Sequence, residues 1–217
     1  MIDRLHYISQ AGHGGHLEAI ERVLQAGGKW IQLRVKNEPE KVVLTLAIAA
    51  AALCKKYGAR LIVNDDPLVA VKADADGVHL GLNDMPVAAA RVIVGPGRII
   101  GGTANTFADI LLRVSEGADY IGLGPYRFTR TKENLSPVIG LSGYIRLMDQ
   151  VKEAGISIPL IAIGGITAAD IPLLMQAGLH GVAVSGAMSI PGGTASILNE
   201  MQQVANPAVH QLKNGTC

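Results

Sequence analysis

The chain has 217 residues, a length that suits one large α/β domain better than two separate domains. Hydrophobic residues make up 49% of it but aromatic residues only 4%, so we expect a core of Ala, Val, Ile and Leu, which is typical of parallel strands covered by helices. A formal net charge of +1 gives no reason to expect nucleic acid or an anionic membrane surface as a partner.

Cysteine usage and hydropathy favour a cytoplasmic protein. The two cysteines, Cys54 and Cys217, do not make a disulfide framework, and Cys54 lies in a helical run where a small buried side chain is expected. We expect no signal peptide, because Met1 is followed almost directly by a strand pattern. The apolar run at residues 42–53 is too short to span a bilayer, so we expect no membrane partner.

Strand-like and helix-like segments alternate along the whole chain. The predicted strands are residues 5–9, 30–35, 60–64, 77–80, 98–103, 120–124, 159–164 and 181–185. The predicted helices include residues 17–25, 39–57, 107–115, 142–153, 168–176 and 195–204.

This alternation predicts the fold. Strict β–α alternation favours a parallel sheet, and eight such units are expected for a single-domain (β/α)8 TIM barrel, which typically needs about 250 residues and can be shorter. A doubly wound sheet is the alternative, but the glycines after the first strand do not fit the G-x-G-x-x-G pattern. We assign residues 1–205 to the barrel and expect residues 206–217 to form a disordered tail. Reactive groups of such barrels lie at the C-terminal ends of the strands.

The second predicted strand ends in polar side chains that share one face. Side chains alternate along a strand, so Gln32, Arg34 and Lys36 point away from the apolar face and toward the barrel mouth. Two cations there would be costly without a bound anion or a carboxylate to balance them. The alternative is that they pair with barrel aspartates in a purely structural network.

The third and fourth strand ends carry carboxylates. Asp65 follows Asn64 at the end of one strand, and Asp84 follows the next strand along the chain. Two carboxylates from neighbouring strand ends can share Mg²⁺, with phosphate oxygens and water completing its coordination. We expect Asp66 to cap the helix that begins at Pro67.

The later strand ends combine glycines, hydroxyls and cations. Gly101 and Gly102 would let a ligand approach the backbone of the fifth strand, and Thr103 offers a hydroxyl there. Gly165 after the seventh strand and Ser185-Gly186 after the eighth match the phosphate site common in these barrels.

The loop after the sixth strand, residues 124–132, is rich in phosphate-binding side chains. It holds the hydroxyls of Thr129 and Thr131 and three cations, one of them Lys132. The alternative is a basic surface loop exposed to solvent. The histidines add little: His79 lies within a predicted strand, where we expect it to pack.

Taken in order, these motifs resemble those of the thiamine phosphate synthase family. The early ones are QLRVK at 32–36, ND at 64–65, and ADGVHLG at 75–81 followed by Asp84. The later ones are GADYIGLGP at 117–125, TRTK at 129–132 and AIGGI at 162–166. Each motif alone is modest, but together they are specific, and the resemblance extends from about Leu5 to Met188.

The resemblance implies a reaction and a set of site residues. The activity would couple 4-amino-5-hydroxymethyl-2-methylpyrimidine diphosphate to 4-methyl-5-(2-phosphoethyl)thiazole, releasing pyrophosphate through a dissociative pyrimidine cation. By resemblance, the diphosphate would be held by Arg34, Lys36, Asn64 and Lys132, and Mg²⁺ by Asp65 and Asp84. Gln32 would face the pyrimidine, while the thiazole phosphate would be held by Thr129, Thr131, Gly165, Ser185 and Gly186. The residues expected to act most directly on the reacting groups are Lys132, Arg34 and Thr103.

The chain departs from the family pattern at three places. Thr103 stands where serine is usual and keeps the hydroxyl. Ser185-Gly186 stands where an aliphatic residue and serine are usual, so the side-chain contact to the thiazole phosphate is in question, although the backbone amides remain. The segment Tyr126-Arg127-Phe128 replaces a common apolar pattern, and the sequence offers no account of Arg127.

Other functions on the same barrel remain alternatives. A related thiazole tautomerase would use a histidine shortly after the fifth strand, where this chain has Thr103-Ala104-Asn105-Thr106. Another phosphosugar isomerase or aldolase would want an acid–base pair or a Schiff-base lysine, for which Lys36 is the candidate. A non-catalytic barrel that binds thiamine precursors is the third, and the sequence leaves a homo-oligomer open.

Overall fold

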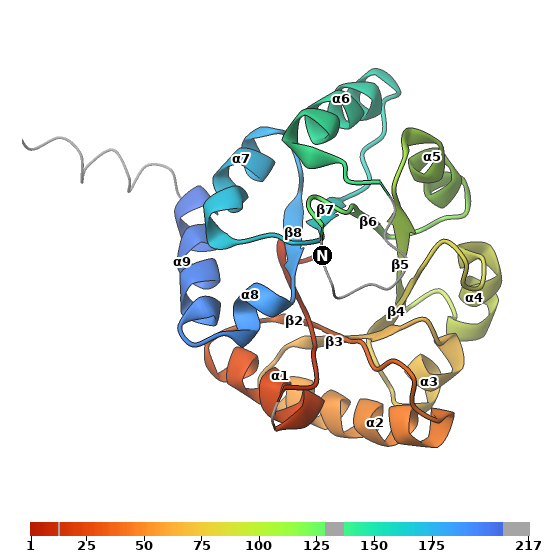
Figure 1. Cartoon of the computed structure of the whole chain (residues 1–217). Coiled ribbons are helices and arrows are strands. Elements are labelled where there is room, and N and C mark those ends of the chain that lie inside the picture. Colours follow the sequence, from red (N-terminus) through yellow and green to blue (C-terminus); the bar gives the residue numbers. More distant parts are fainter. Residues whose placement is uncertain (13, 129–136, 206–217) are drawn as a thin grey trace, which may run out of the picture.

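The computed structural model, which describes residues 1–12, 14–128 and 137–205, is a closed barrel of eight parallel strands surrounded by helices (Figure 1). The strands pair in sequence order and the barrel closes between β1 and β8. They are β1 (Leu5–Ile8), β2 (Trp30–Leu33), β3 (Arg60–Asn64), β4 (Gly77–Leu80), β5 (Ile99–Ala104), β6 (Tyr120–Leu123), β7 (Leu160–Ile163) and β8 (Gly181–Val184). The predicted (β/α)8 barrel and all eight predicted strands are confirmed.

Helices cover the outside of this barrel in chain order (Figure 1). They are α1 (Gly15–Gln25), α2 (Glu40–Lys56), α3 (Pro67–Lys72), α4 (Val87–Val94), α5 (Phe107–Ser115), α6 (Gly140–Glu153), the 3₁₀ turn η1 (Ala168–Asp170), α7 (Ile171–Gln176), α8 (Gly186–Ser189) and α9 (Gly193–Ala205). Asp66 caps α3 as predicted, because its carboxylate accepts from the N–H groups of Leu68 and Val69. None of the helices in these ranges is long and apolar enough to cross a membrane.

Alternation along the strands divides the core into two clusters. The larger cluster lies between barrel and helices and is mainly aliphatic, with Ile31 and Leu33 among its members. The smaller one lines the barrel interior and consists of Ile8, Trp30, Ile62, Tyr120, Ile161 and Ala183. The expectation of a core without aromatic residues is therefore wrong for the interior, where few positions exist and large rings fill them. Residues 206–217, predicted to be a disordered tail, lie outside the described residues.

Candidate active site at the strand ends

The ends of β2 and β3 place polar side chains inside the barrel mouth, as the alternation predicts. Gln32 is buried and donates from its Nε2 to the Oδ1 of Asn64 at 2.6 Å. The backbone N–H of Arg34 donates to the Oγ of Ser9 at 3.1 Å, and the same hydroxyl contacts the Nδ1 of His16 at 2.9 Å. Burial, with a smaller contribution from Arg34, lowers the pKa of His16. Gln32 and Asn64 therefore bond to each other across neighbouring strands, and the backbone of Arg34 is held close by through Ser9.

Lys36, Asp65 and Asp84 form a charged cluster next to this contact. The Lys36 ammonium makes an ion pair with the Asp65 carboxylate. Asp65 adopts a φ of 70°, in the left-handed region, and its N–H donates to the carbonyl of His79 at 2.8 Å. Burial, the hydrogen bond with Asp65 and the charge of Asp65 together raise the pKa of Asp84, against opposing effects of the Gly81 N–H and Lys36. The two predicted metal ligands thus lie against each other.

These residues fit a hard cation. Two adjacent carboxylates repel each other, and Mg²⁺ prefers oxygen ligands of this type. Within residues 1–12, 14–128 and 137–205, no group of three His, Cys, Asp or Glu side chains could hold a metal ion. At this place the described residues offer a cation two carboxylates, so an ion bound there would need further oxygen ligands.

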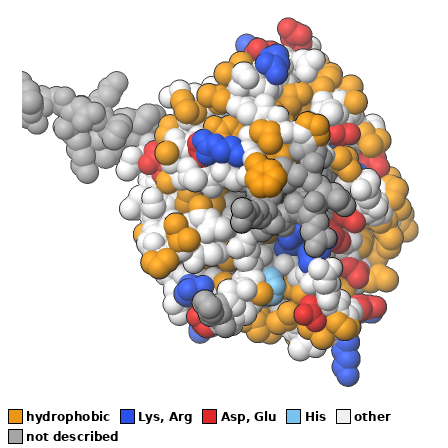
Figure 2. Space-filling view, in the orientation of Figure 1, with side chains coloured by type: hydrophobic (Ala, Val, Ile, Leu, Met, Phe, Trp, Pro, Cys, Tyr) orange, Lys and Arg blue, Asp and Glu red, His pale blue; other side chains and the backbone are white. Residues whose placement is uncertain are grey.

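Figure 2 shows basic and acidic side chains close together near the centre of the face seen in Figure 1, with hydrophobic side chains scattered over the surrounding helices. Charged side chains therefore gather over the mouth of a barrel whose interior is lined by hydrophobic side chains.

Thr103, at the end of β5, belongs to a polar chain inside the barrel. The Nε2 of His79 contacts the Oγ1 of Thr103 at 3.1 Å, and its Nδ1 contacts the hydroxyl of Tyr120 at 3.0 Å. His79 is therefore more than a packing residue, because it connects the predicted catalytic hydroxyl with the barrel floor. In one tautomer of neutral His79 the ring donates to Tyr120 and accepts from Thr103, and in the other these roles are exchanged.

The glycines of β5 have a different purpose from the one predicted. A Cβ on Gly101 would lie 2.2 Å from the ring of Tyr120, and one on Gly102 would lie 2.6 Å from the Cδ of Arg113. These glycines make room for side chains of this chain itself. The expectation that they let a ligand approach the backbone is therefore wrong.

The ends of β7 and β8 contribute backbone more than side chains. The Ser185 hydroxyl donates to the carbonyl of Ile8 at 2.6 Å and so ties β8 to β1. A Cβ on Gly186 would meet open space, which leaves its backbone approachable. Gly165 has a φ of 66°, and a Cβ there would lie 3.0 Å from that of Arg127. Glycine at 165 thus allows the segment after β6 to pack closely on the segment after β7.

Arg127, which the sequence does not explain, holds these two segments together. Its Nη1 and Nη2 donate to the two carboxylate oxygens of Asp170, each at 2.5 Å. Asp170 also accepts from the N–H and hydroxyl of Thr167, at 2.9 and 2.8 Å. Burial alone would raise the pKa of Asp170, but the bonds from Arg127 and Thr167 hold it below its ordinary value.

Some site residues escape sequence analysis, and some lie outside the structure described. Thr129, Thr131 and Lys132 fall in the range 129–136, outside the described residues. Arg113 and Asp170 were not predicted from the sequence, because each lies in a helical segment away from the strand ends. Both side chains are charged and buried, which would have marked them as functional candidates, but burial cannot be read from a single sequence.

A (β/α)8 barrel whose strands end in carboxylates, cations and glycines at one rim has the architecture of the (β/α)8 barrel enzymes, whose active sites lie at that rim. The sequence matches the family model described as thiamine monophosphate synthase over residues 6–188. The chain belongs to this family.

Individual relatives agree with this assignment. The thiamine-phosphate synthase of Flavobacterium johnsoniae is 51% identical over 86% of this chain and 88% of its own length. That of Bacteroides fragilis is 50% identical over 82% of this chain and 88% of its own length. The solved structure of thiamine phosphate pyrophosphorylase from Pyrococcus furiosus is 30% identical, covers 93% of this chain and 96% of its own, and has a TM-score of 0.82.

Proposed function

We propose that the chain is a Mg²⁺-dependent transferase that joins a pyrimidine methyl diphosphate to a thiazole phosphate, giving thiamine phosphate and pyrophosphate. Family membership supports the reaction class. The observation that carries the Mg²⁺-dependent form of the proposal is the contact between the Asp65 and Asp84 carboxylates, with Lys36 paired to one of them. We place the enzyme in the cytoplasm, where its partners would be these small molecules.

The diphosphate belongs at the ends of β2, β3 and β4. Arg34 and Lys36 would supply positive charge there, and Asn64 would supply an amide for hydrogen bonding. Lys36 now neutralises Asp65, so a diphosphate that takes the ammonium would leave Asp65 available to a cation. Asp65 and Asp84 would hold Mg²⁺, which when bound offsets the negative charge of the departing pyrophosphate.

The chemistry needs electrostatic help more than a general base. The bond between the pyrimidine methylene and the diphosphate oxygen breaks with its electron pair leaving on oxygen, and the thiazole nitrogen then bonds to the methylene cation. No net proton transfer is required. Lys132 and the Thr103 hydroxyl are assigned to the leaving group and the cation, with Gln32 facing the pyrimidine.

The thiazole phosphate belongs on the opposite side of the mouth. Gly165 and the backbone at Ser185-Gly186 follow β7 and β8, and Thr129 and Thr131 belong to the segment after β6. Because the Ser185 hydroxyl already bonds to Ile8, we assign the backbone N–H groups, not this side chain, to phosphate. An isomerase would have no use for the carboxylates on the other side.

The test is product formation from both substrates, with Mg²⁺ and with EDTA. Thiamine phosphate formed only with Mg²⁺ is the expected result, because the carboxylate pair needs a cation to accept a diphosphate beside it. Equal formation in EDTA would overturn the metal assignment. A folded protein that binds either substrate but makes no product would overturn the transferase in favour of a tautomerase or a non-catalytic binder.

A further inference from the structure

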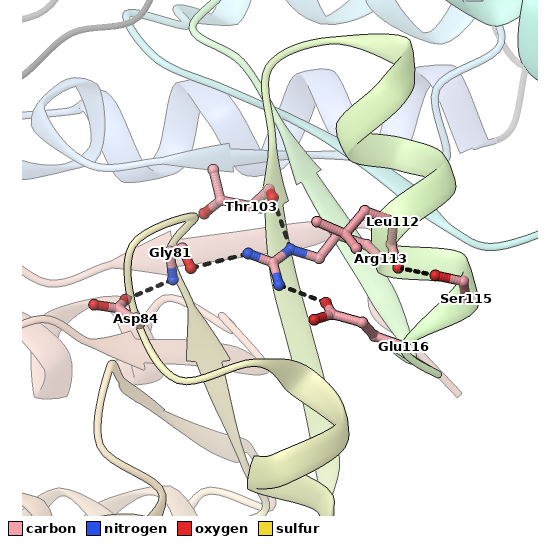
Figure 3. Close-up of polar contacts among 7 residues, drawn as sticks. All are labelled: Gly81, Asp84, Thr103, Leu112, Arg113, Ser115 and Glu116. Carbon is pink, nitrogen blue, oxygen red and sulfur yellow. Dashed lines mark hydrogen bonds and ion pairs between the residues drawn. The ribbon is translucent and has the colours of Figure 1, made fainter.

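A buried arginine outside the strand-end motifs contacts both β4 and β5 at the mouth. Arg113 lies on α5 and is 2% exposed. Each nitrogen of its guanidinium has a partner: Nε donates to the Thr103 carbonyl at 3.1 Å, Nη2 to the Gly81 carbonyl at 2.9 Å, and Nη1 to Glu116 at 2.6 Å (Figure 3). Glu116 balances the charge, so the guanidinium is buried with its charge and its donors satisfied.

The contact with Gly81 acts on the metal-ligand candidate Asp84. The Gly81 N–H donates to the Oδ2 of Asp84 at 2.6 Å (Figure 3). The Asp84 N–H donates back to the Gly81 carbonyl at 3.3 Å. Arg113 donates to that same carbonyl. The turn that orients the Asp84 carboxylate is therefore fixed from behind by the guanidinium.

The contact with Thr103 acts on the hydroxyl assigned to the reacting groups. Arg113 bonds to the Thr103 carbonyl, while the Thr103 side chain points into the barrel toward His79. The arginine stem passes directly over Gly102, where a Cβ would lie 2.6 Å from its Cδ. One side chain thus sets the spacing between the end of β5 and the turn after β4.

We propose that Arg113 is a positioning residue, which holds Asp84 and Thr103 in register so that the diphosphate end of the mouth is formed before substrate binds. The catalytic consequence of this role rests on the proposed function, whereas the contacts of Arg113 are seen in the structure itself. A planar guanidinium can span two carbonyls and a carboxylate, and neither lysine nor an apolar side chain can. Substituting residues that orient metal ligands typically costs about 10–100-fold in affinity or activity.

The test compares Arg113→Met with a matched control on another helix. Arg91 on α4 also bonds to two carbonyls, those of Gly95 and Arg98, and to the carboxylate of Asp119. Arg98 and Asp119 come just before β5 and β6, at the opposite rim of the barrel. Arg91→Met therefore removes a similar set of bonds without touching the mouth.

For Arg113→Met we expect the KM for the pyrimidine diphosphate and the Mg²⁺ concentration at half-maximal rate each to rise about tenfold. The KM for the thiazole phosphate should change little, since its residues lie after β6 to β8. Arg91→Met should lower thermal stability and leave all three constants unchanged. Arg113→Lys keeps the positive charge but loses the planar guanidinium with its fixed set of donors, so it should fold and still show the raised constants. It is the variant to measure if Arg113→Met does not fold.

Calorimetry with Mg²⁺ and pyrophosphate gives a second measurement, independent of turnover. Wild type should bind pyrophosphate in the presence of Mg²⁺ about tenfold more tightly than Arg113→Lys does. If wild type is active and Arg113→Lys has the same kinetic constants and binds pyrophosphate equally well, the positioning role of Arg113 is overturned and the proposed reaction stands. Wild type that binds Mg²⁺ and pyrophosphate but makes no product would overturn the proposed reaction, and the binding difference would still decide the role of Arg113. Wild type that does neither would overturn both.

Discussion

Replacing Asp65 with asparagine should lower the Mg²⁺-dependent rate by at least about a hundredfold, equivalent to ~2.7 kcal/mol in the activation barrier. Asp84→Asn should have a comparable effect. Each change removes one of the two carboxylates that lie against each other at the ends of β3 and β4. A single remaining carboxylate holds Mg²⁺ weakly, and pyrophosphate then departs without charge compensation.

The same variants should fold normally without metal. Asp65 pairs with a half-exposed Lys36, and such pairs contribute little to stability. Asn at position 84 keeps an oxygen for the Gly81 N–H and removes the repulsion from Asp65. The thermal midpoint of metal-free Asp84→Asn should therefore equal or exceed that of wild type.

Asp66→Asn is the matched control for these rates. Asp66 is the neighbour of Asp65 but caps α3, and asparagine caps helices as well as aspartate does. Steady-state rates over a Mg²⁺ titration should show wild-type behaviour for this variant. A near-normal rate in Asp65→Asn would remove Asp65 from the metal site.

The fold was predictable because one physical pattern repeats eight times. Apolar strands of four to six residues alternate with amphipathic helices, and this alternation is typical of a parallel sheet covered by helices. Eight such units in one chain favour closure of that sheet into a barrel. The same topology makes the ends of neighbouring strands meet at one rim. Gln32 and Asn64, 32 residues apart, were therefore predicted at the same place and form a hydrogen bond there.

Contacts that depend on how a helix is rotated were not predictable. Arg113 reaches Gly81 across 32 residues and Arg127 reaches Asp170 across 43. Nothing in a local sequence pattern says which side chain of α5 points inward, because the apolar stripe of an amphipathic helix sets its buried face only to within one or two positions. The glycines of β5 were misinterpreted for the same reason, since the ring and guanidinium stem that require them are distant in sequence.

The second large effect concerns the pair Arg127–Asp170. We expect Arg127→Met to lower the free energy of unfolding at pH 7 by about 2 kcal/mol, less than for a fully buried pair because the Arg127 side chain is 49% exposed. Among the described residues, the loss leaves the carboxylate of Asp170, whose side chain is 5% exposed, with Thr167 as its remaining side-chain partner. Denaturant unfolding of wild type, Arg127→Met, Asp170→Asn and the double variant should give a coupling of about 1–2 kcal/mol.

The pH dependence of this coupling follows from the lowered pKa of Asp170. A carboxyl whose pKa is lower in the folded state contributes stability above its ordinary pKa, and this is lost as pH falls through the folded value. The difference between wild type and Arg127→Met should therefore be constant from pH 7 to about 5 and shrink below about pH 4, the ordinary carboxyl range. A difference that stays constant into acid would mean that Arg127 stabilises through packing on Tyr126, whose ring lies 4.7 Å from its guanidinium carbon, and not through Asp170.

Lys72→Met is the control for a merely local charge effect. Lys72 and Glu40 form an ion pair on the exposed faces of α3 and α2, and breaking it should change the unfolding curve little at any pH.

The Arg127–Asp170 pair differs because it joins the segment after β6 to the one after β7, which carry Gly165 and the residues assigned to the thiazole phosphate. If that connection matters for binding, Arg127→Met should raise the KM for the thiazole phosphate and leave that for the pyrimidine diphosphate unchanged, the reverse of the pattern expected for Arg113→Met.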